Sequence, residues 1–176
     1  MDVIEAIQKR HSYRGTFHDE PPNRADLQNI VECGIRAPSG CNAQTTSFII
    51  VTNREKIKNI GDVTQYPFVQ NAPALIVCAV NKEPVYHDMS FEKEDCAAAV
   101  ENMLLAITAL GYASVWVDGA IRREGRNKKI GRILNIPENL NVQVILPVGK
   151  PTEEKQQKSK KDFSERAFWE EYQTTP

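Results

Sequence analysis

The chain lacks several features that would assign it at once to a well-known class of protein. None of its apolar runs approaches the roughly 20 residues that a membrane-spanning helix needs, and residues 1–10 lack the apolar core of a signal peptide. With 22 basic and 23 acidic residues the formal net charge is −1, so no global basic field is available to hold nucleic acid or an anionic membrane. These absences predict a cytoplasmic protein that binds neither membranes nor nucleic acid.

The chain is also poor in cysteine and in the common catalytic signatures. It has no GxGxxG dinucleotide fingerprint, no GxxxxGK[ST] phosphate loop and no GxSxG nucleophile elbow. Its three histidines form no HxxxH or HExxH pair, so the sequence predicts no metal site. The cysteines stand too far apart for a CxxC pair and are predicted to be free thiols: Cys33, Cys41, Cys78 and Cys96.

What the 176 residues do contain suits one globular domain. Hydrophobic residues make up 41% and charged residues 26%, which is too apolar for a disordered chain. The length suits a single core, and no internal repeat interrupts it. We therefore predict one domain over residues 1–176. Its last part, 151–176, is a polar, lysine-rich tail with three apolar anchors: Phe163, Phe168 and Trp169.

Hydrophobic periodicity predicts helices that alternate with strands. One helix follows Pro22, with Asn23 as its N-cap, and the other helices are predicted over four ranges: 2–9, 54–61, 95–110 and 123–134. Short β-rich runs predict four buried strands: 47–52, 74–80, 113–117 and 142–148. The helix over 95–110 is apolar over most of its circumference, which is typical of a core or a subunit interface. This alternation predicts a layered α/β or α+β fold.

The first candidate binding segment is the basic stretch that follows the first helix. It holds two guanidinium groups, an imidazole and a hydroxyl within five residues: Arg10, His11, Ser12 and Arg14. Such a group suits a phosphate, because the forked donors of arginine match its oxygens. The alternative is a solvated charged turn, which from composition alone is the more common case.

A second candidate is the loop between the second helix and the first strand. Its small residues let a ligand approach the backbone closely, and its two amide side chains can read the edge of a heterocycle. The residues concerned are Pro38, Ser39, Asn42 and Gln44. An ordinary turn explains this loop equally well.

A third candidate is the pair Asp118 and Gly119, which ends a predicted strand. Ligands of open α/β sheets tend to bind outside the carboxyl ends of strands, where a glycine exposes its N–H. A tight turn is the more common reason for this dipeptide.

In their order along the chain, these segments resemble the nitroreductase family of FMN-dependent oxidoreductases. Residues 10–14 resemble that family's R-[RH]-S-x-R segment, and APSGCNAQ at 37–44 resembles its A-P-S-x-x-N-x-Q loop. The 95–119 block resembles its long central helix and the strand that carries a flavin-contacting glycine, and PVGKP at 147–151 resembles its closing strand. The resemblance covers nearly the whole chain. It implies an α+β fold in which helices flank a mixed central sheet, and a homodimer with an exchanged C-terminal segment.

The resemblance also implies which residues bind FMN. Its phosphate would be held from both ends of the chain: Arg10, His11, Ser12, Arg14, Lys158 and Lys160. Its isoalloxazine ring would be lined by a loop of the partner subunit: Pro38, Ser39, Asn42 and Gln44. Gly119 would offer its N–H near the flavin N5 and O4 edge, with Asp118 beside it. Tyr66 and Phe68 would either shape the substrate pocket or belong to the core, and core is the more common case for such aromatics.

The implied activity is a ping-pong cycle. NADH or NADPH would deliver a hydride to flavin N5 and leave, and a nitroaromatic, a quinone or a related small organic acceptor would then take the electrons. No catalytic side chain is expected, because the cofactor carries the chemistry. Two alternatives stay open: a specialised flavin reaction on the same fold, of the dehalogenation or oxidase type, and an FMN-binding protein without enzymatic activity. Thr45 and Thr46 replace the family's frequent Pro-Trp, and residues 60–93 match nothing firmly, which leaves the substrate open.

Overall fold

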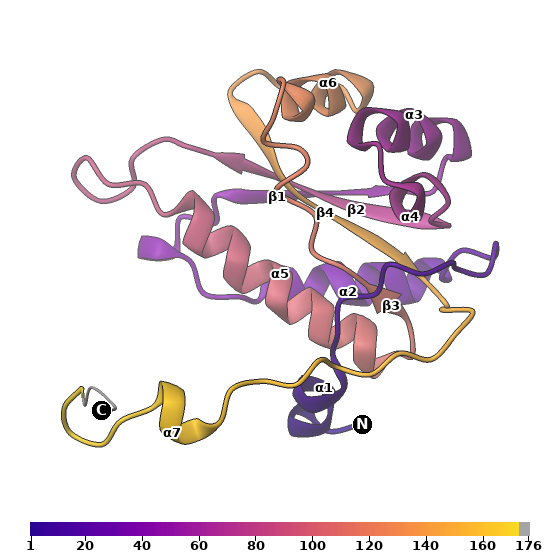
Figure 1. Cartoon of the computed structure of the whole chain (residues 1–176). Coiled ribbons are helices and arrows are strands. Elements are labelled where there is room, and N and C mark those ends of the chain that lie inside the picture. Colours follow the sequence, from indigo (N-terminus) through magenta and orange to yellow (C-terminus); the bar gives the residue numbers. More distant parts are fainter. Residues whose placement is uncertain (173–176) are drawn as a thin grey trace.

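The four β-rich runs form one sheet at the centre of the molecule (Figure 1). A computed structural model describes residues 1–172, so the end of the predicted tail, 173–176, lies outside the described residues. The strands are β1 (Thr46–Val51), β2 (Ala74–Asn81), β3 (Ala113–Ser114) and β4 (Leu140–Gly149). Their order in the sheet is β1-β2-β4-β3, so the two longest and most apolar strands lie side by side in the middle.

Neighbouring strands run antiparallel throughout the sheet of the described chain, which corrects the prediction of a mixed sheet. Three pairings set the register: Thr46 with Val80, Ala74 with Val148, and Ala113 with Gly149. The periodicity of a strand reports which faces are buried and carries no information on direction. Direction depends on the course of the long helical connections, which the local pattern does not encode.

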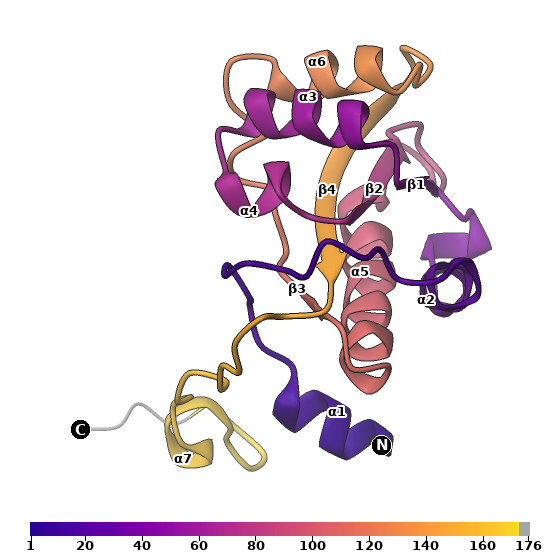
Figure 2. The same cartoon turned by 90° about the vertical axis from the view of Figure 1, so that its right-hand side faces the viewer.

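Helices cover both faces of the sheet (Figures 1 and 2). α2 (Arg24–Ile35) and α5 (Glu92–Ala109) lie on one face, and α3 (Arg54–Thr64), α4 (Pro67–Gln70) and α6 (Arg126–Ile133) lie on the other. Successive side chains of β2 therefore alternate between two apolar clusters. Leu75 and Val77 pack with α3 and α6, whereas Ile76 and Cys78 pack with α2 and α5. The α+β prediction is confirmed, with the sheet as the middle of three layers.

The predicted helix boundaries agree with the structure to within a few residues. The Asn23 side chain accepts a hydrogen bond from the Asp26 N–H at 2.8 Å, which confirms it as an N-cap. The long apolar helix begins at Glu92, three residues before its predicted start, and Gly111 follows its end with a left-handed φ of +79°. Tyr112 then donates a hydrogen bond to Asp26 at 2.7 Å, and burial together with this carboxylate raises the pKa of Tyr112 to about 12.

Both ends of the chain leave apolar side chains uncovered. The first helix, α1 (Val3–Lys9), buries only Ala6, whereas its apolar residues Val3, Ile4 and Ile7 are 63%, 60% and 48% exposed. The tail runs away from the sheet and carries the short α7 (Phe163–Arg166) (Figure 1). Three of its aromatic residues are largely exposed: Phe163, Trp169 and Tyr172. We call these two groups of side chains the open apolar surfaces.

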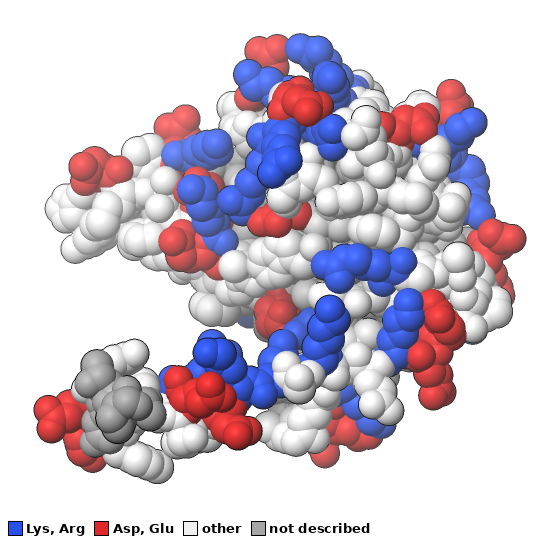
Figure 3. All heavy atoms as spheres, in the orientation of Figure 1, with Lys and Arg blue, Asp and Glu red and all other residues white. Residues whose placement is uncertain are grey.

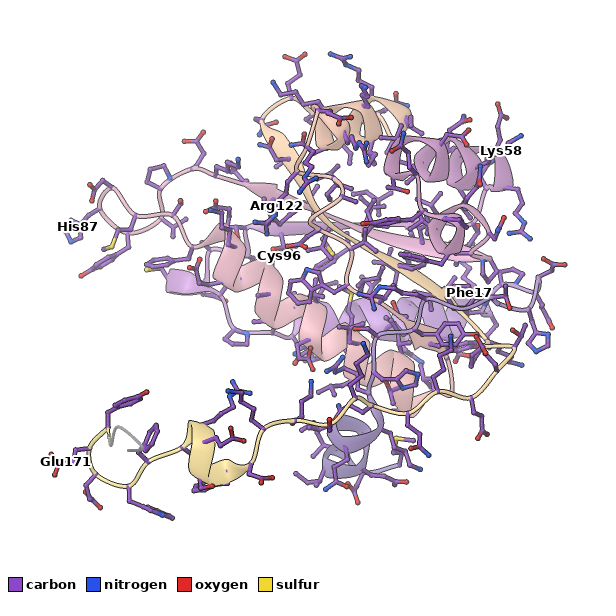
Figure 4. The ribbon with its side chains drawn as sticks, viewed as in Figure 1. Phe17, Lys58, His87, Cys96, Arg122 and Glu171 are labelled. Atoms are coloured by element: carbon purple, nitrogen blue, oxygen red, sulfur yellow. The ribbon has the colours of Figure 1, made fainter. Side chains whose placement is uncertain are left out.

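All four cysteines are free thiols. Cys78 on β2 and Cys96 on α5 are both buried and belong to the same apolar cluster. Figure 4 shows Cys96 on the side of α5 that faces the sheet. A hydrogen bond with Cys96, together with burial, raises the pKa of the Cys78 thiol well above its usual value, so this thiol stays protonated. Within residues 1–172, no helix combines the length and the apolar character needed to cross a membrane.

Candidate functional site

A cavity of about 680 Å³ opens beside β3, between the chain that follows this strand and the turn that joins α3 to α4. Five of the residues predicted from sequence line it, although they come from three separate segments: Arg14, Tyr66, Phe68, Asp118 and Gly119. We call this space the large cavity. Its volume is that of a typical pocket for a small molecule or a cofactor.

The basic segment reaches the large cavity because it runs along the outer side of β3. The Tyr13 N–H donates a hydrogen bond to the Ser114 carbonyl at 2.8 Å. In an extended segment neighbouring side chains point to opposite sides. Tyr13 is accordingly buried in the core, whereas Ser12 and Arg14 are exposed on the other side. The predicted strand over 113–117 is interrupted: after Ser114 the pairing with β4 breaks at Val115 and Trp116, which line the cavity, and it resumes as a single bridge between Val117 and Ile145.

The tail crosses the same basic segment at Gln157, a residue that the sequence did not single out. The Gln157 side-chain amide donates a hydrogen bond to the Arg10 carbonyl at 2.6 Å, and Lys158 follows it directly. Figure 3 shows Lys and Arg side chains gathered on the lower part of the molecule, around α1 and the start of the tail. Lys158 and Lys160 are exposed. The basic segment and the tail, which were both predicted to bind the phosphate, thus lie side by side, although 147 residues separate Arg10 from Gln157.

Arg10 and His11 are less open than Arg14. The Arg10 Nε lies 3.2 Å from a carboxylate oxygen of Glu101 on α5, and its side chain is 21% exposed. The His11 Nδ1 lies 3.0 Å from the Lys9 carbonyl. Arg10 would therefore have to share its guanidinium between Glu101 and a ligand, whereas the Arg14 side chain faces the large cavity.

Gly119 is a glycine that the fold itself does not require. Its φ lies outside the left-handed region, and a Cβ added at this position would meet no atom within 4 Å. A glycine with neither a strained backbone nor a crowded neighbour leaves room for something that approaches the backbone from outside. The neighbouring Asp118 is held by Arg122, whose Nη2 donates a hydrogen bond to the carboxylate at 2.5 Å (Figure 4).

Tyr66 and Phe68 form one wall of the large cavity. Their rings stack with centroids 4.9 Å apart and an interplanar angle of 22°. Phe68 also packs against the core cluster of α3 and α6, whereas Tyr66 is 39% exposed. The sequence left open whether these aromatics belong to the core or shape the pocket. Phe68 packs on the core and supports the wall, and Tyr66 presents its surface to the cavity.

Arg126 joins the two sides of the large cavity, and the sequence reading missed it. Its guanidinium donates to the Thr64 carbonyl at 3.3 Å, to the Gln65 side chain at 3.0 Å and to Glu124 at 3.1 Å. Its side chain is only 14% exposed. One signal in the sequence could have pointed to Arg126. It stands three residues after Arg123 at the start of a predicted basic helix, and residues at this spacing share one face of a helix.

The loop predicted to line a ring lies at a second, smaller cavity of about 280 Å³. Pro38, Ser39 and Gln44 line this cavity, and Asn42 does not. The loop contains the single turn η1 (Gly40–Asn42), and Asn42 and Gln44 both have left-handed φ values. The two cavities have no lining residue in common. Within one chain, the loop therefore does not join the other predicted residues.

Asp95, at the start of α5, holds this loop in place. One of its carboxylate oxygens accepts the Gly40 N–H and the other accepts the Thr45 hydroxyl, both at 2.8 Å. Asp95 is 6% exposed, so these hydrogen bonds are shielded from water. In the sequence Asp95 was only part of a thin polar stripe on an apolar helix, because its partners lie 55 and 50 residues away.

Replacing Asp95 by Ala should lower the free energy of unfolding by about 3 kcal/mol, since a hydrogen bond to a charged group contributes about 1.5–3 kcal/mol and two are lost. Asp95→Asn keeps one acceptor oxygen and should cost about half as much. Urea unfolding of both variants would test this expectation. An unfolding midpoint for Asp95→Ala that equals that of the unchanged protein would contradict this role of Asp95.

Comparison with known proteins places the chain in one family. The model of the Nitroreductase family matches residues 7–65 and 62–150. The chain is 36% identical over 159 residues to the "Putative NADH dehydrogenase/NAD(P)H nitroreductase" of Archaeoglobus fulgidus, a match that covers 88% of each. It is 27% identical to the iodotyrosine deiodinase of Thermotoga neapolitana, over 88% of this chain and 92% of that protein.

Solved structures agree with this placement. An FMN-dependent nitroreductase from Clostridium difficile R20291 superposes with a TM-score of 0.84 at 25% identity, over 96% of this chain and 99% of the other. The fold with helices on both faces of its sheet, the sequence match and the structural match agree. The chain belongs to the nitroreductase family.

Proposed function

We propose that this protein is a single-domain, cytoplasmic, FMN-dependent oxidoreductase that takes reducing equivalents from NADH or NADPH. The observation that carries the proposal is the large cavity, where Arg14, the Tyr66 wall and the open backbone at Gly119 meet. The "FMN reductase [NAD(P)H]" of Bacillus subtilis, 26% identical over 86% of this chain, supports both the cofactor and the reductant.

The residues present fit FMN. Arginine suits a phosphate, and the basic segment offers Arg10, Ser12 and Arg14 with the lysine-bearing tail beside them. The open backbone at Gly119 fits a flat ring that approaches closely, and Tyr66 and Phe68 offer a flat wall. When bound, the flavin supplies the atom that accepts and returns a hydride. The chain's own part is to bind, orient and shield the reactants.

A homodimer accounts for two features of the single chain. The loop at Pro38, Ser39, Asn42 and Gln44 lies apart from the large cavity of its own chain, which fits a loop that lines the ring in the partner subunit. A second copy would also cover the open apolar surfaces at Val3, Ile4 and Ile7 and on the tail, because exposed apolar patches mark interaction sites. We propose that the tail is exchanged between the two subunits.

For the reaction itself we propose a ping-pong cycle that ends on a nitroaromatic, a quinone or a related small organic acceptor. The exposed rim of the large cavity at Tyr66 would let the two substrates enter in turn. The likeness to a deiodinase favours a second candidate, reductive dehalogenation on the same site.

The visible spectrum of the purified protein tests the cofactor, and mixing with NADH or NADPH under anaerobic conditions tests the reaction. We expect a yellow protein with a flavin spectrum that is rapidly bleached by one or both nucleotides and restored by a nitroaromatic or a quinone. A colourless protein that fails to bind added FMN would contradict the whole proposal. A yellow protein that neither nucleotide bleaches would contradict the reaction and leave a specialised or non-enzymatic flavoprotein.

A further inference from the structure

The rim of the large cavity holds more positive charge than the protein itself neutralises. Three arginines line the cavity, Arg14, Arg123 and Arg126, against two acids, Asp118 and Glu124. Both acids already have a partner. Asp118 is paired with Arg122 at 2.5 Å, and Glu124 with Arg126 at 3.1 Å.

Two guanidinium groups are left over. Among residues 1–172, neither Arg14 nor Arg123 has a carboxylate within ion-pairing distance, and neither side chain makes a hydrogen bond to the protein. Arg14 belongs to the segment that we assign to FMN. Arg123 belongs to the turn between Gly119 and α6, outside the residues that we assign to FMN, and it is exposed.

The turn that carries Arg123 is held by its own backbone. The Arg126 N–H donates to the Arg123 carbonyl at 3.0 Å, and the Asn127 N–H donates to the Ile121 carbonyl at 3.0 Å. The partly buried Arg126 side chain then ties this turn to the end of α3. Arg123 therefore projects from a fixed position, so binding a ligand there costs little ordering of the backbone.

We infer that Arg123 binds an anionic group on the substrate and thereby selects among substrates, an inference that rests on the proposed function. A guanidinium matches the oxygens of a phosphate or a carboxylate with two parallel hydrogen bonds. The group is either the 2′-phosphate of NADPH or a carboxylate on the electron acceptor. In both cases the anion lies on the rim of the large cavity, and the reacting part of the substrate lies deeper, toward Gly119.

The test compares substrates with and without the proposed anionic group in the FMN-loaded Arg123→Gln variant. Anaerobic flavin reduction is followed with NADPH and with NADH, and flavin reoxidation with para-nitrobenzoate and with para-nitrobenzamide. Loss of one charge-assisted bidentate contact should lower kcat/KM about 10- to 100-fold for NADPH or for para-nitrobenzoate, and should leave its counterpart, NADH or para-nitrobenzamide, within about 2-fold. Arg123→Lys, which keeps the charge without the fork, should lose less. Lys129→Gln removes the same charge from an exposed position of α6 outside the cavity and should change neither pair.

The outcomes distinguish the 2′-phosphate from the carboxylate, and they distinguish a failure of this inference from a failure of the proposed function. A loss confined to NADPH assigns the 2′-phosphate, and a loss confined to para-nitrobenzoate assigns a carboxylate. An equal loss for both members of each pair, or no loss at all, overturns the inference. Calorimetric titration of the unchanged protein and of Arg123→Gln with adenosine 2′,5′-bisphosphate, each compared with AMP, gives a readout that needs no turnover: only the unchanged protein should prefer the bisphosphate. If the unchanged protein lacks flavin or is not bleached, the proposed function fails, and the titration still decides whether Arg123 holds a phosphate.

Discussion

The double variant Arg10→Ala, Arg14→Ala should lose its FMN on gel filtration. A hydrogen bond to a charged group contributes about 1.5–3 kcal/mol, so removal of two guanidinium groups from a phosphate should weaken binding by roughly 100-fold or more. The fold should survive, because Arg14 contacts no acid of the described chain and the partly exposed Arg10–Glu101 pair contributes only about 0–1 kcal/mol. The ratio of flavin absorbance to protein absorbance after the column measures the loss.

The matched control removes two positive charges elsewhere. Lys56 on α3 and Lys129 on α6 are exposed and line neither the large nor the small cavity. Their double replacement by Ala should leave FMN bound at the original ratio. If the arginine variant keeps as much flavin as the lysine control, the basic segment is a solvated turn and the phosphate assignment is wrong. The single variants add a finer expectation: Arg14→Ala should cost more than Arg10→Ala, because Arg10 is shared with Glu101.

The second large effect is expected at Gly119, where one methyl group should impair the reaction without harming the fold. A Cβ at this position meets no atom of residues 1–172 within 4 Å, so Gly119→Ala should unfold at the same temperature as the unchanged protein or slightly above it. The same methyl group would push a bound ring away from the backbone. Since a misplacement of about 1 Å can cost roughly 100-fold in rate, kcat/KM should fall by about that factor.

Gly131→Ala provides the comparison for this variant. Gly131 lies on α6, and a Cβ there meets its first neighbour, Ile136, only at 3.9 Å, an ordinary contact. It lies outside the large cavity, so activity and flavin content should stay unchanged. Thermal unfolding and steady-state kinetics of the two variants decide the matter. A Gly119→Ala protein that is fully active but less stable would show that the glycine serves the fold.

Much of the local structure was predictable because it follows from interactions within a few residues. The alternation of Leu75, Ile76, Val77 and Cys78 between two apolar clusters follows from the pleat of a strand. Asn23 caps α2 through a neighbour three residues away. Strand direction was not predictable in this way, and the antiparallel pairing of β2 with β4 depends on where the long connection through α5 returns.

The candidate site was predictable as a set of residue types and not as an arrangement. Arg14, Tyr66 and Gly119 could each be chosen for its chemistry, and the resemblance to a flavoprotein family supplied a common role. Arg126 and Asp95 were missed because the contacts that tie them to other segments are to residues 50 or more positions away along the chain. A long-range hydrogen bond leaves no periodic trace in the sequence, so a partly buried arginine of this kind cannot be told from an exposed one.

The sequence by itself determined the helices and strands of this protein and the order of its three candidate binding segments, 10–14, 37–44 and 118–119. Through that order it also indicated the family. These properties follow from backbone preferences and hydrophobic spacing, which act over a few residues. Only the tertiary structure decided that Arg14 and Gly119 share one cavity while the loop at Ser39 lies at another, and that Arg123 has no acidic partner among residues 1–172. Ion pairs, cavities and unmatched charges depend on distances through space, and folding brings segments together that the chain keeps far apart.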